Sequence, residues 1–183
     1  MMDKHEIRKA VKAVKKLLTA EQRTESAASA LAVVEALPQF AAATNVLVYH
    51  SLPDELSTIA FIERWAERKR LLLPRVNGDD LDVLEYNPQQ LHTGAFNIQE
   101  PTGGVLFDPE RIELVIVPAV AYDRHGNRIG RGKGYYDRLL RRTPQALKVG
   151  VAYQCQICDD FTPDEFDIPV DIVITDQGII KPL

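Results

Sequence analysis

The sequence predicts one α/β domain in three layers, with a mostly parallel or mixed central sheet and helices on both faces. Along the 183 residues, apolar segments of strand length alternate with segments of helical periodicity. Several of these strands are apolar throughout, and such strands belong to sheets that are covered on both sides. No repeat, low-complexity tract or linker is evident, so we expect a single domain over 1–183.

The first part of the chain predicts two helices. Residues 4–18 place apolar side chains at helical spacing on one face, which we expect to pack inward. These apolar side chains are Ile7, Val11, Val14 and Leu18. The opposite side carries the cations Lys4, Arg8, Lys12, Lys15 and Lys16. Thr19 opens a second helix that runs to Leu37, and Gln22 occupies its capping-box position.

The rest of the chain predicts alternating strands and helices. We expect strands at 45–51, 70–76, 81–86, 114–122, 148–153 and 171–176. A helix is expected near 57–68, with Ile59, Ile62 and Ala66 facing inward. Residues 87–110 are rich in proline, glycine and polar residues and are expected to be mostly loop.

The stretch 123–138, DRHGNRIGRGKGYYDR, carries the clearest functional signal. Four glycines alternate with four cations, and the helix-like segment YYDRLLRR follows directly. The cations are Arg124, Arg128, Arg131 and Lys133. Glycine lets the backbone approach a ligand closely, and arginine and lysine bind phosphate oxygens. Backbone N–H groups at a helix start favour the same charge. The stretch therefore predicts an anion site, with polyphosphate as its guest, although a solvated glycine-rich loop remains the alternative.

Neither common nucleotide-binding fingerprint fits this stretch. A Walker A loop requires glycine where Asn127 stands and serine or threonine where Gly134 stands. A dinucleotide fingerprint requires glycine at the position of Tyr135. In parallel sheets ligands bind beyond the carboxyl ends of the strands, and the glycine-rich stretch follows such a strand.

Net charge and hydropathy argue against two classes of partner, nucleic acids and membranes. The net charge is −4 and the pI is near 5.6, so positive charge is local and general nucleic-acid binding is not expected. The N-terminus MMDKHEIRK has no signal-peptide core, and no apolar run approaches a membrane span. We therefore expect a cytoplasmic protein with no membrane partner.

The two cysteines, Cys155 and Cys158, form one C-x-x-C pair. A redox pair would stand at a helix start after a strand, and this pair does follow the apolar run KVGVAY. A structural zinc site requires four ligands, but the four histidines are scattered without metal-binding spacing. Two reduced thiols are the simpler interpretation.

The motifs, taken in order, resemble the 5-formyltetrahydrofolate cyclo-ligase family, whose members are also called methenyltetrahydrofolate synthetases. The run GNRIGRGKGYYDRLL after VPAVAYD carries the resemblance most specifically. Weaker elements are the basic start KHEIR, the turn YHSLPDE, the segment from Gly94 to Pro101, and the closing segment from Asp167 to Thr175. The Gly94 element has a longer spacing than the family pattern. The resemblance covers nearly the whole chain.

This resemblance implies an ATP- and magnesium-dependent ring closure on a Rossmann-like scaffold, related to isomerases and CoA-transferase-like proteins. The formyl oxygen of 5-formyltetrahydrofolate attacks the γ-phosphate, nitrogen 10 attacks the activated carbon, and phosphate leaves. The products are 5,10-methenyltetrahydrofolate, ADP and phosphate. We expect a monomer that binds these two substrates and Mg²⁺.

The resemblance also assigns roles to individual residues. Catalytic roles are implied for Arg131, Lys133 and Tyr136. ATP binding is implied for Lys4, His5, Glu6, Ile7, Arg8, Arg128, Ile129, Gly130, Arg131, Gly132, Lys133, Gly134, Tyr135 and Tyr136. Folate binding is implied for His50, Glu55 and Tyr136. Magnesium binding is implied for Asp137 and Asp167, with Asp171 as the alternative to Asp167.

Several of these residues have simpler interpretations. Asp137 could cap the helix or pair with Arg141 one turn later, although we expect a metal ligand and not a structural ion pair. Asp167 could be a turn residue, and Glu55 a first-turn helix residue. Tyr135 and Tyr136 could belong to the core.

Two other functions remain open at this point. One is an ATP-free relative on the same kind of scaffold, such as a sugar-phosphate isomerase or a CoA-transferase-like protein, because fold alone does not fix function. The other is a non-catalytic, RNA-associated protein, which the acidic pI disfavours. The basic helix, glycine-rich stretch and Asp137 together favour a metal-bound triphosphate.

Overall fold

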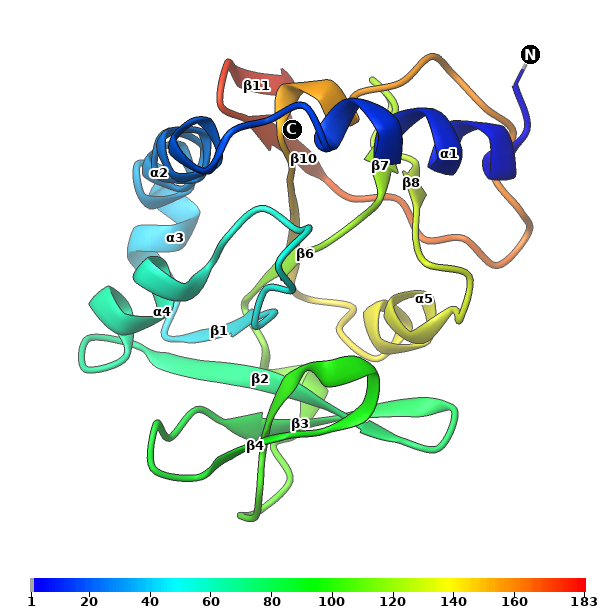
Figure 1. Cartoon of the computed structure of the whole chain (residues 1–183). Helices are drawn as coiled ribbons and strands as arrows, with labels where there is room; N and C mark the ends of the chain where they lie inside the picture. Colours follow the sequence, from blue (N-terminus) through cyan, green and yellow to red (C-terminus); the bar gives the residue numbers. More distant parts are fainter. Residues whose placement is uncertain (1) are drawn as a thin grey trace.

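Seven strands form one central sheet in the order β11-β10-β9-β6-β1-β2-β3 in the computed structural model, which describes residues 2–183 (Figure 1). The inner strands run parallel, and β3 and β11 pair antiparallel at the two edges. The strands are β1 (Asn45–Val48), β2 (Arg70–Asn77), β3 (Asp80–Glu85), β6 (Leu114–Val117), β9 (Leu147–Val151), β10 (Ile172–Thr175) and β11 (Gly178–Lys181). This mixed, mostly parallel sheet confirms the predicted fold class.

Helices cover both faces of the sheet. The helices are α2 (Ala20–Glu35), α3 (Pro38–Ala42) and α4 (Ile59–Trp65) on one face, and α5 (Tyr135–Arg141) on the other. In Figure 1 the first three lie to the left of the sheet and α5 lies to the right. Successive strand residues point to opposite faces. Val46 and Val48 of β1 therefore join the core under α2–α4, while Leu47 joins the core under α5.

The helix α1 (Lys4–Lys15) begins with a capping box at Asp3. The Asp3 carboxylate accepts the Glu6 N–H at 2.8 Å, and the Glu6 carboxylate accepts the Asp3 N–H at 2.9 Å. These two bonds satisfy N–H groups that a helix start leaves unpaired. The helix ends three residues earlier than predicted, and its buried residues Ile7 and Val11 pack against the β7–β8 hairpin, described below.

The inward face of α1 differs from the prediction at its last turn. Ile7 and Val11 are buried as predicted, but Val14 is exposed and Lys15, expected in solvent, is buried. Residues 7, 11 and 15 follow one another at intervals of four, so they share a helix face. Lys15 can be buried because an acidic turn, described below, lies against it.

The start of α2 confirms the capping prediction. Thr19 Oγ1 accepts the Gln22 N–H at 3.1 Å, and Gln22 accepts the Thr19 N–H at 2.9 Å. The helix ends at Glu35, two residues before the predicted end, and Pro38 begins the short α3. None of the helices within residues 2–183 combines the length and the apolar character that crossing a bilayer requires.

The predicted strand 114–122 is divided in two. β6 ends at Val117, and after Pro118 the chain enters β7 (Ala121–Tyr122), which pairs antiparallel with β8 (Arg128–Ile129) in a separate two-stranded hairpin. Proline has no N–H for a sheet ladder, which explains the break. Neither β8 nor β11 was predicted from the sequence.

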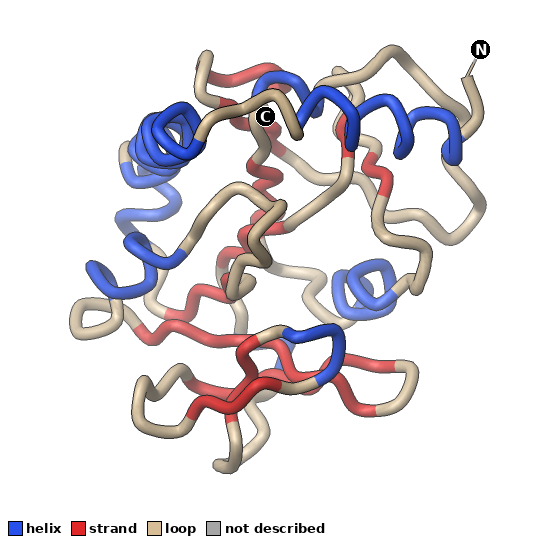
Figure 2. The backbone as a smooth tube through the Cα atoms, in the orientation of Figure 1, coloured by secondary structure: helices blue, strands red, loops and turns tan. Residues whose placement is uncertain are grey.

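The segment 87–110 is mostly loop, as predicted, but it contains a small hairpin. β4 (Leu91–Thr93) pairs antiparallel with β5 (Gln99–Pro101), and the 3₁₀ helix η1 (Ala95–Asn97) forms the tip. Figure 2 shows this tip as a blue turn between two red strands. Two further 3₁₀ turns are η2 (Pro109–Arg111) and η3 (Gln154–Gln156).

Candidate functional site

A cavity of about 790 Å³ lies at the carboxyl ends of the parallel strands. His50 follows β1, Pro74 and Val76 lie in the second half of β2, and Ala119 follows β6; all four residues line it. The chain passes from β1 to β2 on one side and later to β6 on the other, so the strand order reverses here. Ligands of open α/β sheets bind at such a reversal, and the volume suits a small-molecule ligand.

The charge of the cavity is opposite to that of the whole chain. Seven cationic side chains and five carboxylates line it. The cations are Lys4, Arg8, Arg128, Arg131, Lys133, Arg138 and Arg141. The carboxylates are Glu55, Glu100, Asp137, Asp164 and Asp167. A chain with a net charge of −4 thus gathers an excess of positive charge at one site, which favours an anionic ligand.

The glycine-rich stretch divides into a hairpin and a loop. Asp123 closes the β7–β8 turn by accepting the N–H groups of His125 and Asn127, each at 2.9 Å. Arg124 is exposed on this turn and does not line the cavity. The loop 130–134 follows β8 and lines the cavity with its backbone and with Arg131 and Lys133.

The loop ends at Gly134, the N-cap of α5, where a left-handed φ of 68° favours glycine. A Cβ at this position would lie 2.8 Å from an Arg138 guanidinium nitrogen. Arg138 in turn donates to the backbone carbonyl of Asp79, in the turn between β2 and β3. Because α5 has only seven residues, we attribute the positive potential mainly to the side chains and not to the helix dipole.

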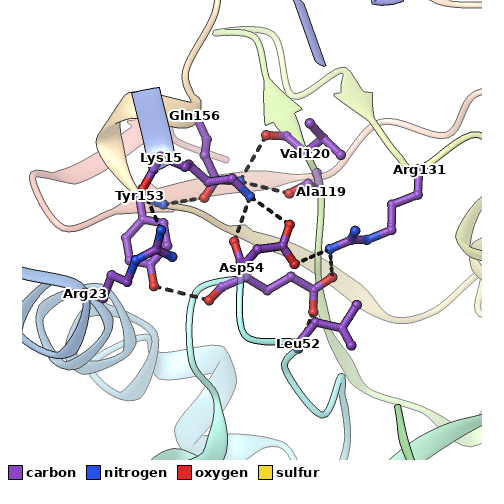
Figure 3. A network of polar contacts seen from close by, with 10 residues as sticks. Lys15, Arg23, Leu52, Asp54, Ala119, Val120, Arg131, Tyr153 and Gln156 are labelled. Atoms are coloured by element: carbon purple, nitrogen blue, oxygen red, sulfur yellow. Dashed lines mark hydrogen bonds and ion pairs between the residues drawn. The ribbon is translucent and has the colours of Figure 1, made fainter. Parts of the chain in front are cut away.

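Arg131 joins the glycine loop to the acidic turn that follows β1. Its Nη2 lies 2.8 Å from Asp54 Oδ1 and 3.2 Å from Glu55 Oε1 (Figure 3). Glu55 also accepts the Leu52 N–H at 2.8 Å through Oε2. Glu55 precedes α4 by several residues, so the interpretation of Glu55 as a first-turn helix residue is wrong. A predicted phosphate ligand and a predicted folate ligand are therefore in direct contact.

Two of the five α1 residues expected at the nucleotide line the cavity, namely Lys4 and Arg8. Arg8 Nε donates to the carbonyl of Gly130 at 2.9 Å, which ties α1 to the glycine loop. The structure does not bring the other three to the cavity: His5 is exposed, Glu6 caps the helix, and Ile7 is buried in a small core cluster.

Lys4 is held by two carboxylates of the segment before β10. Its Nζ lies 2.6 Å from Asp164 and 2.5 Å from Asp167. Partial burial by itself raises the pKa of Asp167, but the hydrogen bond and charge of Lys4 outweigh burial and hold this pKa below its usual value. Asp167 therefore lies at the cavity as predicted. Asp171 does not line the cavity; its carboxylate accepts the N–H of Lys148 in β9.

Asp137 forms a structural ion pair, contrary to expectation. Its Oδ1 lies 2.8 Å from Arg128 Nη2 and accepts the Ile168 N–H at 3.0 Å. The alternative prediction, a pair between Asp137 and Arg141, is wrong, because the Arg141 guanidinium donates to the carbonyl of Phe166. Asp137 nevertheless lines the cavity beside the glycine loop, so its role toward magnesium remains a prediction.

Two buried polar atoms of the cavity wall have no hydrogen-bond partner within residues 2–183. These atoms are the Tyr136 hydroxyl and Arg128 Nε. Buried polar groups are nearly always paired, so two unpaired atoms at a cavity point to a ligand. Burial raises the pKa of Tyr136 well above its usual value, which keeps the hydroxyl protonated. Burial lowers the pKa of His50, a half-buried residue on the same wall.

Three cavity residues of the β4–β5 hairpin were not predicted from the sequence. Phe96, Ile98 and Glu100 line the cavity, and the Phe96 ring lies 6.1 Å from that of Tyr135. The segment from Gly94 to Pro101 carried a family signal, but it lay in a region predicted as loop. Nothing in its polarity indicated that an exposed aromatic residue would reach the glycine loop.

The donor set fits a magnesium ion that arrives with a ligand. Within residues 2–183 no three histidine, cysteine or acidic side chains gather into a metal site. Mg²⁺ is commonly held by one or two carboxylates together with substrate phosphates. Asp137 and Asp167 line one cavity and could supply those carboxylates.

Both cysteines are free thiols. Burial and nearby carboxylates raise the pKa of Cys158 to about 11, and burial raises that of Cys155. Thiols with raised pKa values are poor nucleophiles. Neither thiol lines the large cavity.

The fold and the cavity together define an α/β protein with a cation-rich cavity beside an acidic turn, at the switch point of its sheet. Residues 1–176 match the model of the 5-formyltetrahydrofolate cyclo-ligase family. The chain is 33% identical to the cyclo-ligase of Escherichia coli over 174 residues, which cover 90% of this chain and 96% of that protein. This chain belongs to the 5-formyltetrahydrofolate cyclo-ligase family, a family of ligases.

Two solved structures have the same fold. The 5,10-methenyltetrahydrofolate synthetase of Aquifex aeolicus aligns with a TM-score of 0.88 at 36% identity, covering 97% of this chain and 92% of its own. The 5,10-methenyltetrahydrofolate synthetase of Mycoplasma pneumoniae aligns with a TM-score of 0.77 at 25% identity, covering 96% and 99%. The recognition made from the sequence motifs is confirmed.

Proposed function

We propose that this protein uses ATP to convert 5-formyltetrahydrofolate into 5,10-methenyltetrahydrofolate, with release of ADP and phosphate. One observation carries the proposal beyond family membership: Arg131 of the cation-rich glycine loop contacts Glu55 of the acidic turn. A loop whose cations suit phosphate oxygens and a carboxylate suited to pterin N–H groups line the same cavity, which supports the proposal. With ATP held at the loop and the pterin at Glu55, the γ-phosphate and the formyl group would lie within reach of each other, as phosphoryl transfer requires.

The reaction needs ATP because the formyl oxygen is a poor leaving group. That oxygen attacks the γ-phosphorus, the bond to ADP breaks, and a phosphorylated formyl group results. The lone pair of nitrogen 10 then attacks the formyl carbon, the carbon–oxygen bond breaks, and phosphate departs with both bonding electrons. Loss of the nitrogen 10 proton completes the methenyl bridge. The protein's contribution is to position the two substrates and to stabilise charge.

The residues of the cavity have matching tasks. Arg131 and Lys133 hold phosphate oxygens, and Arg8 holds the loop through Gly130. Charge-assisted bonds to phosphate are about twice as strong as neutral ones. Glu55 accepts N–H groups of the pterin ring. The protonated Tyr136 hydroxyl lies in the cavity wall and has no partner within the described chain. It donates a hydrogen bond to an oxygen of the bound ligand.

Magnesium belongs to the nucleotide in this proposal. When bound, it neutralises phosphate charge and polarises the transferred phosphoryl group. Asp137 and Asp167 would hold it, directly or through water, and their carboxylates are then kept close to the phosphates without repulsion.

An oxygen-isotope experiment tests the phosphorylated intermediate. We expect that 5-formyltetrahydrofolate labelled with oxygen-18 in its formyl group yields inorganic phosphate carrying one labelled oxygen per methenyl product. Mass spectrometry of the released phosphate measures the transfer. Methenyl product with unlabelled phosphate would contradict the intermediate, and product without any phosphate release would favour an ATP-free relative.

A further inference from the structure

Lys15 stands out among the basic residues of α1 because its side chain is only 6% exposed. Its Nζ donates to the backbone carbonyl of Asp54 at 2.7 Å and lies 3.4 Å from Asp54 Oδ2. A buried ammonium group needs such partners to offset its lost hydration. The residues are 39 positions apart in the sequence, so the contact fixes α1 to the turn after β1.

The Asp54 carboxylate divides its two oxygens between two cations. Oδ2 faces Lys15, while Oδ1 accepts a hydrogen bond from Arg131 Nη2 at 2.8 Å (Figure 3). Burial by itself raises the pKa of Asp54, but the hydrogen bond from Arg131 and the charge of Lys15 lower it below its usual value. The three side chains Lys15, Asp54 and Arg131 thus alternate in charge, from the buried Lys15 of α1 to the glycine loop.

Arg131 contacts a second carboxylate, Glu55, and the same nitrogen serves both. The backbone around Glu55 is held independently, because the Tyr153 hydroxyl donates to the Glu55 carbonyl at 3.2 Å. If Glu55 binds pterin N–H groups, it cannot also neutralise Arg131 fully. Asp54 can remain paired with Arg131 while the Glu55 carboxylate binds the pterin N–H groups.

We propose that Asp54, oriented by the buried Lys15, is a positioning residue that holds Arg131 between the nucleotide and folate ends of the cavity. The inference rests on the proposed function and extends it to a residue with no assigned role. Without Asp54, Glu55 is the remaining partner of Arg131, so folate must compete with Arg131 for Glu55. Asp54 therefore affects both substrates, but only through Arg131.

A double-mutant cycle tests this dependence, with the variants Asp54→Asn, Arg131→Ala and the combination. Isothermal titration measures Kd for Mg-ATP and for 5-formyltetrahydrofolate separately, so the result does not depend on turnover. We expect Asp54→Asn to weaken binding of each ligand roughly three- to fivefold, the range for a half-exposed ion pair. In the Arg131→Ala background, Asp54→Asn should leave the Kd for Mg-ATP unchanged, because no guanidinium remains to be positioned.

The folate result separates positioning from a purely structural role. Arg131→Ala should restore folate affinity to the Asp54→Asn protein, because it removes the competitor for Glu55. A structural defect at Asp54 would persist in the double variant. Equal effects of Asp54→Asn in both backgrounds, or no effect in either, would overturn the proposal.

Two controls accompany the cycle. Asp160→Asn removes a carboxylate of comparable exposure, 63% against 53%, from a pair with His125 outside the cavity, and should bind both ligands as wild type does. Thermal unfolding of each variant verifies folding. Asp54→Asn should fold, because Lys15 keeps its bond to the backbone carbonyl of residue 54.

A wild-type protein that bound neither ligand would contradict the proposed function itself, a result distinct from a failed cycle.

Discussion

Arg131 and Lys133 differ in their surroundings although both line the cavity from one loop. Arg131 is held by Asp54 and Glu55, whereas Lys133 is an exposed side chain at the loop end. Cations in a glycine loop have little packing to lose, so their removal should affect ligand binding far more than folding.

We predict that Arg131→Ala and Lys133→Ala each weaken Mg-ATP binding by about 1.5–3 kcal/mol, roughly tenfold or more, because each removes one charge-assisted phosphate contact. Steady-state kinetics with varied ATP measures the effect. Arg124→Ala is the matched control, since this exposed cation of the same stretch lies on the hairpin turn away from the cavity. Unchanged ATP kinetics in both loop variants would contradict the phosphate assignment.

Asp137 has a structural partner that changes the outcome expected from its replacement. The Arg128 side chain is 5% exposed, and breaking a buried pair leaves a charge without compensation. We predict that Asp137→Asn lowers the free energy of unfolding by about 3 kcal/mol or somewhat less, because asparagine retains hydrogen-bonding capacity. Urea unfolding without ligands measures this effect.

A magnesium titration of Asp137→Asn separates the metal role from the ion pair. If Asp137 also holds magnesium, activity falls strongly at low Mg²⁺ and recovers partly at high Mg²⁺. If Asp137 only pairs with Arg128, the loss of activity in Asp137→Asn is the same at every Mg²⁺ concentration. Superimposable titration curves for variant and wild type, after correction for folded fraction, would remove the metal assignment.

At the scale of elements, the β7–β8 hairpin and its turn deliver the glycine loop to the cavity. Gly126 has a φ of 85° in this turn, and its carbonyl accepts the Val170 N–H at 2.9 Å. A Cβ on Gly126 would lie 2.5 Å from the Val170 carbonyl oxygen. The turn therefore requires glycine for its conformation and for its close approach to the segment before β10.

We predict that Gly126→Ala destabilises the fold by more than about 1–2 kcal/mol, the usual cost of a left-handed residue with a side chain, because the clash adds to it. Gly78→Ala is the matched control: Gly78 has a φ of 62°, but a Cβ there would meet no atom within 4 Å beyond its chain neighbours. Chemical denaturation of both variants gives the comparison. An equal loss in the two variants would show that the Val170 contact contributes nothing.

The sequence predicted elements well where periodicity and caps are local. Thr19 and Gln22 lie three residues apart, so their capping box could be recognised directly. The burial of Lys15 could not be, because its partner Asp54 is distant in sequence and only the folded sheet brings them together. The short strand β8 has two residues, too few for a detectable period.

The site residues show the same contrast between local patterns, which the sequence reveals, and contacts between distant residues, which it does not. The glycine-loop residues were found from their pattern, whereas the pairing of Asp137 with Arg128 depends on how the β7–β8 hairpin turns back toward α5. The family resemblance of the KHEIR segment implied His5, Glu6 and Ile7 together with Lys4 and Arg8, but these three residues do not line the cavity. Family motifs indicate positions along a chain, and helix geometry decides which side chains reach the ligand.

At the scale of the whole molecule, the first helix and a segment near the last strands meet at the cavity. Lys4 of the first helix pairs with Asp167 near the last strands, across 163 positions. This contact fixes the start of α1 beside the cavity, so it should contribute to global stability as well as to ligand binding. Its strength depends on the ionisation of Asp167, whose pKa is lowered in the fold.

We predict that Asp167→Asn is less stable than wild type at neutral pH and that the difference shrinks in acid. The folded pKa of Asp167 lies below its ordinary value of 3.8, so its stabilisation is complete above that value and is lost as the pH falls through the folded pKa. Urea unfolding of both proteins from about pH 7 to about pH 3 measures the difference. A difference that stays constant with pH would contradict the ion-pair interpretation.

In the function that we propose, one cavity joins ATP and 5-formyltetrahydrofolate for ring closure. The most direct measurement is the near-ultraviolet absorbance of the methenyl product after mixing purified protein, 5-formyltetrahydrofolate and Mg-ATP. We predict an absorbance gain in the complete mixture and none when ATP is omitted or when the Arg131→Ala, Lys133→Ala double variant replaces wild type. No gain with wild type, under conditions where the Escherichia coli relative forms product, would contradict the claim.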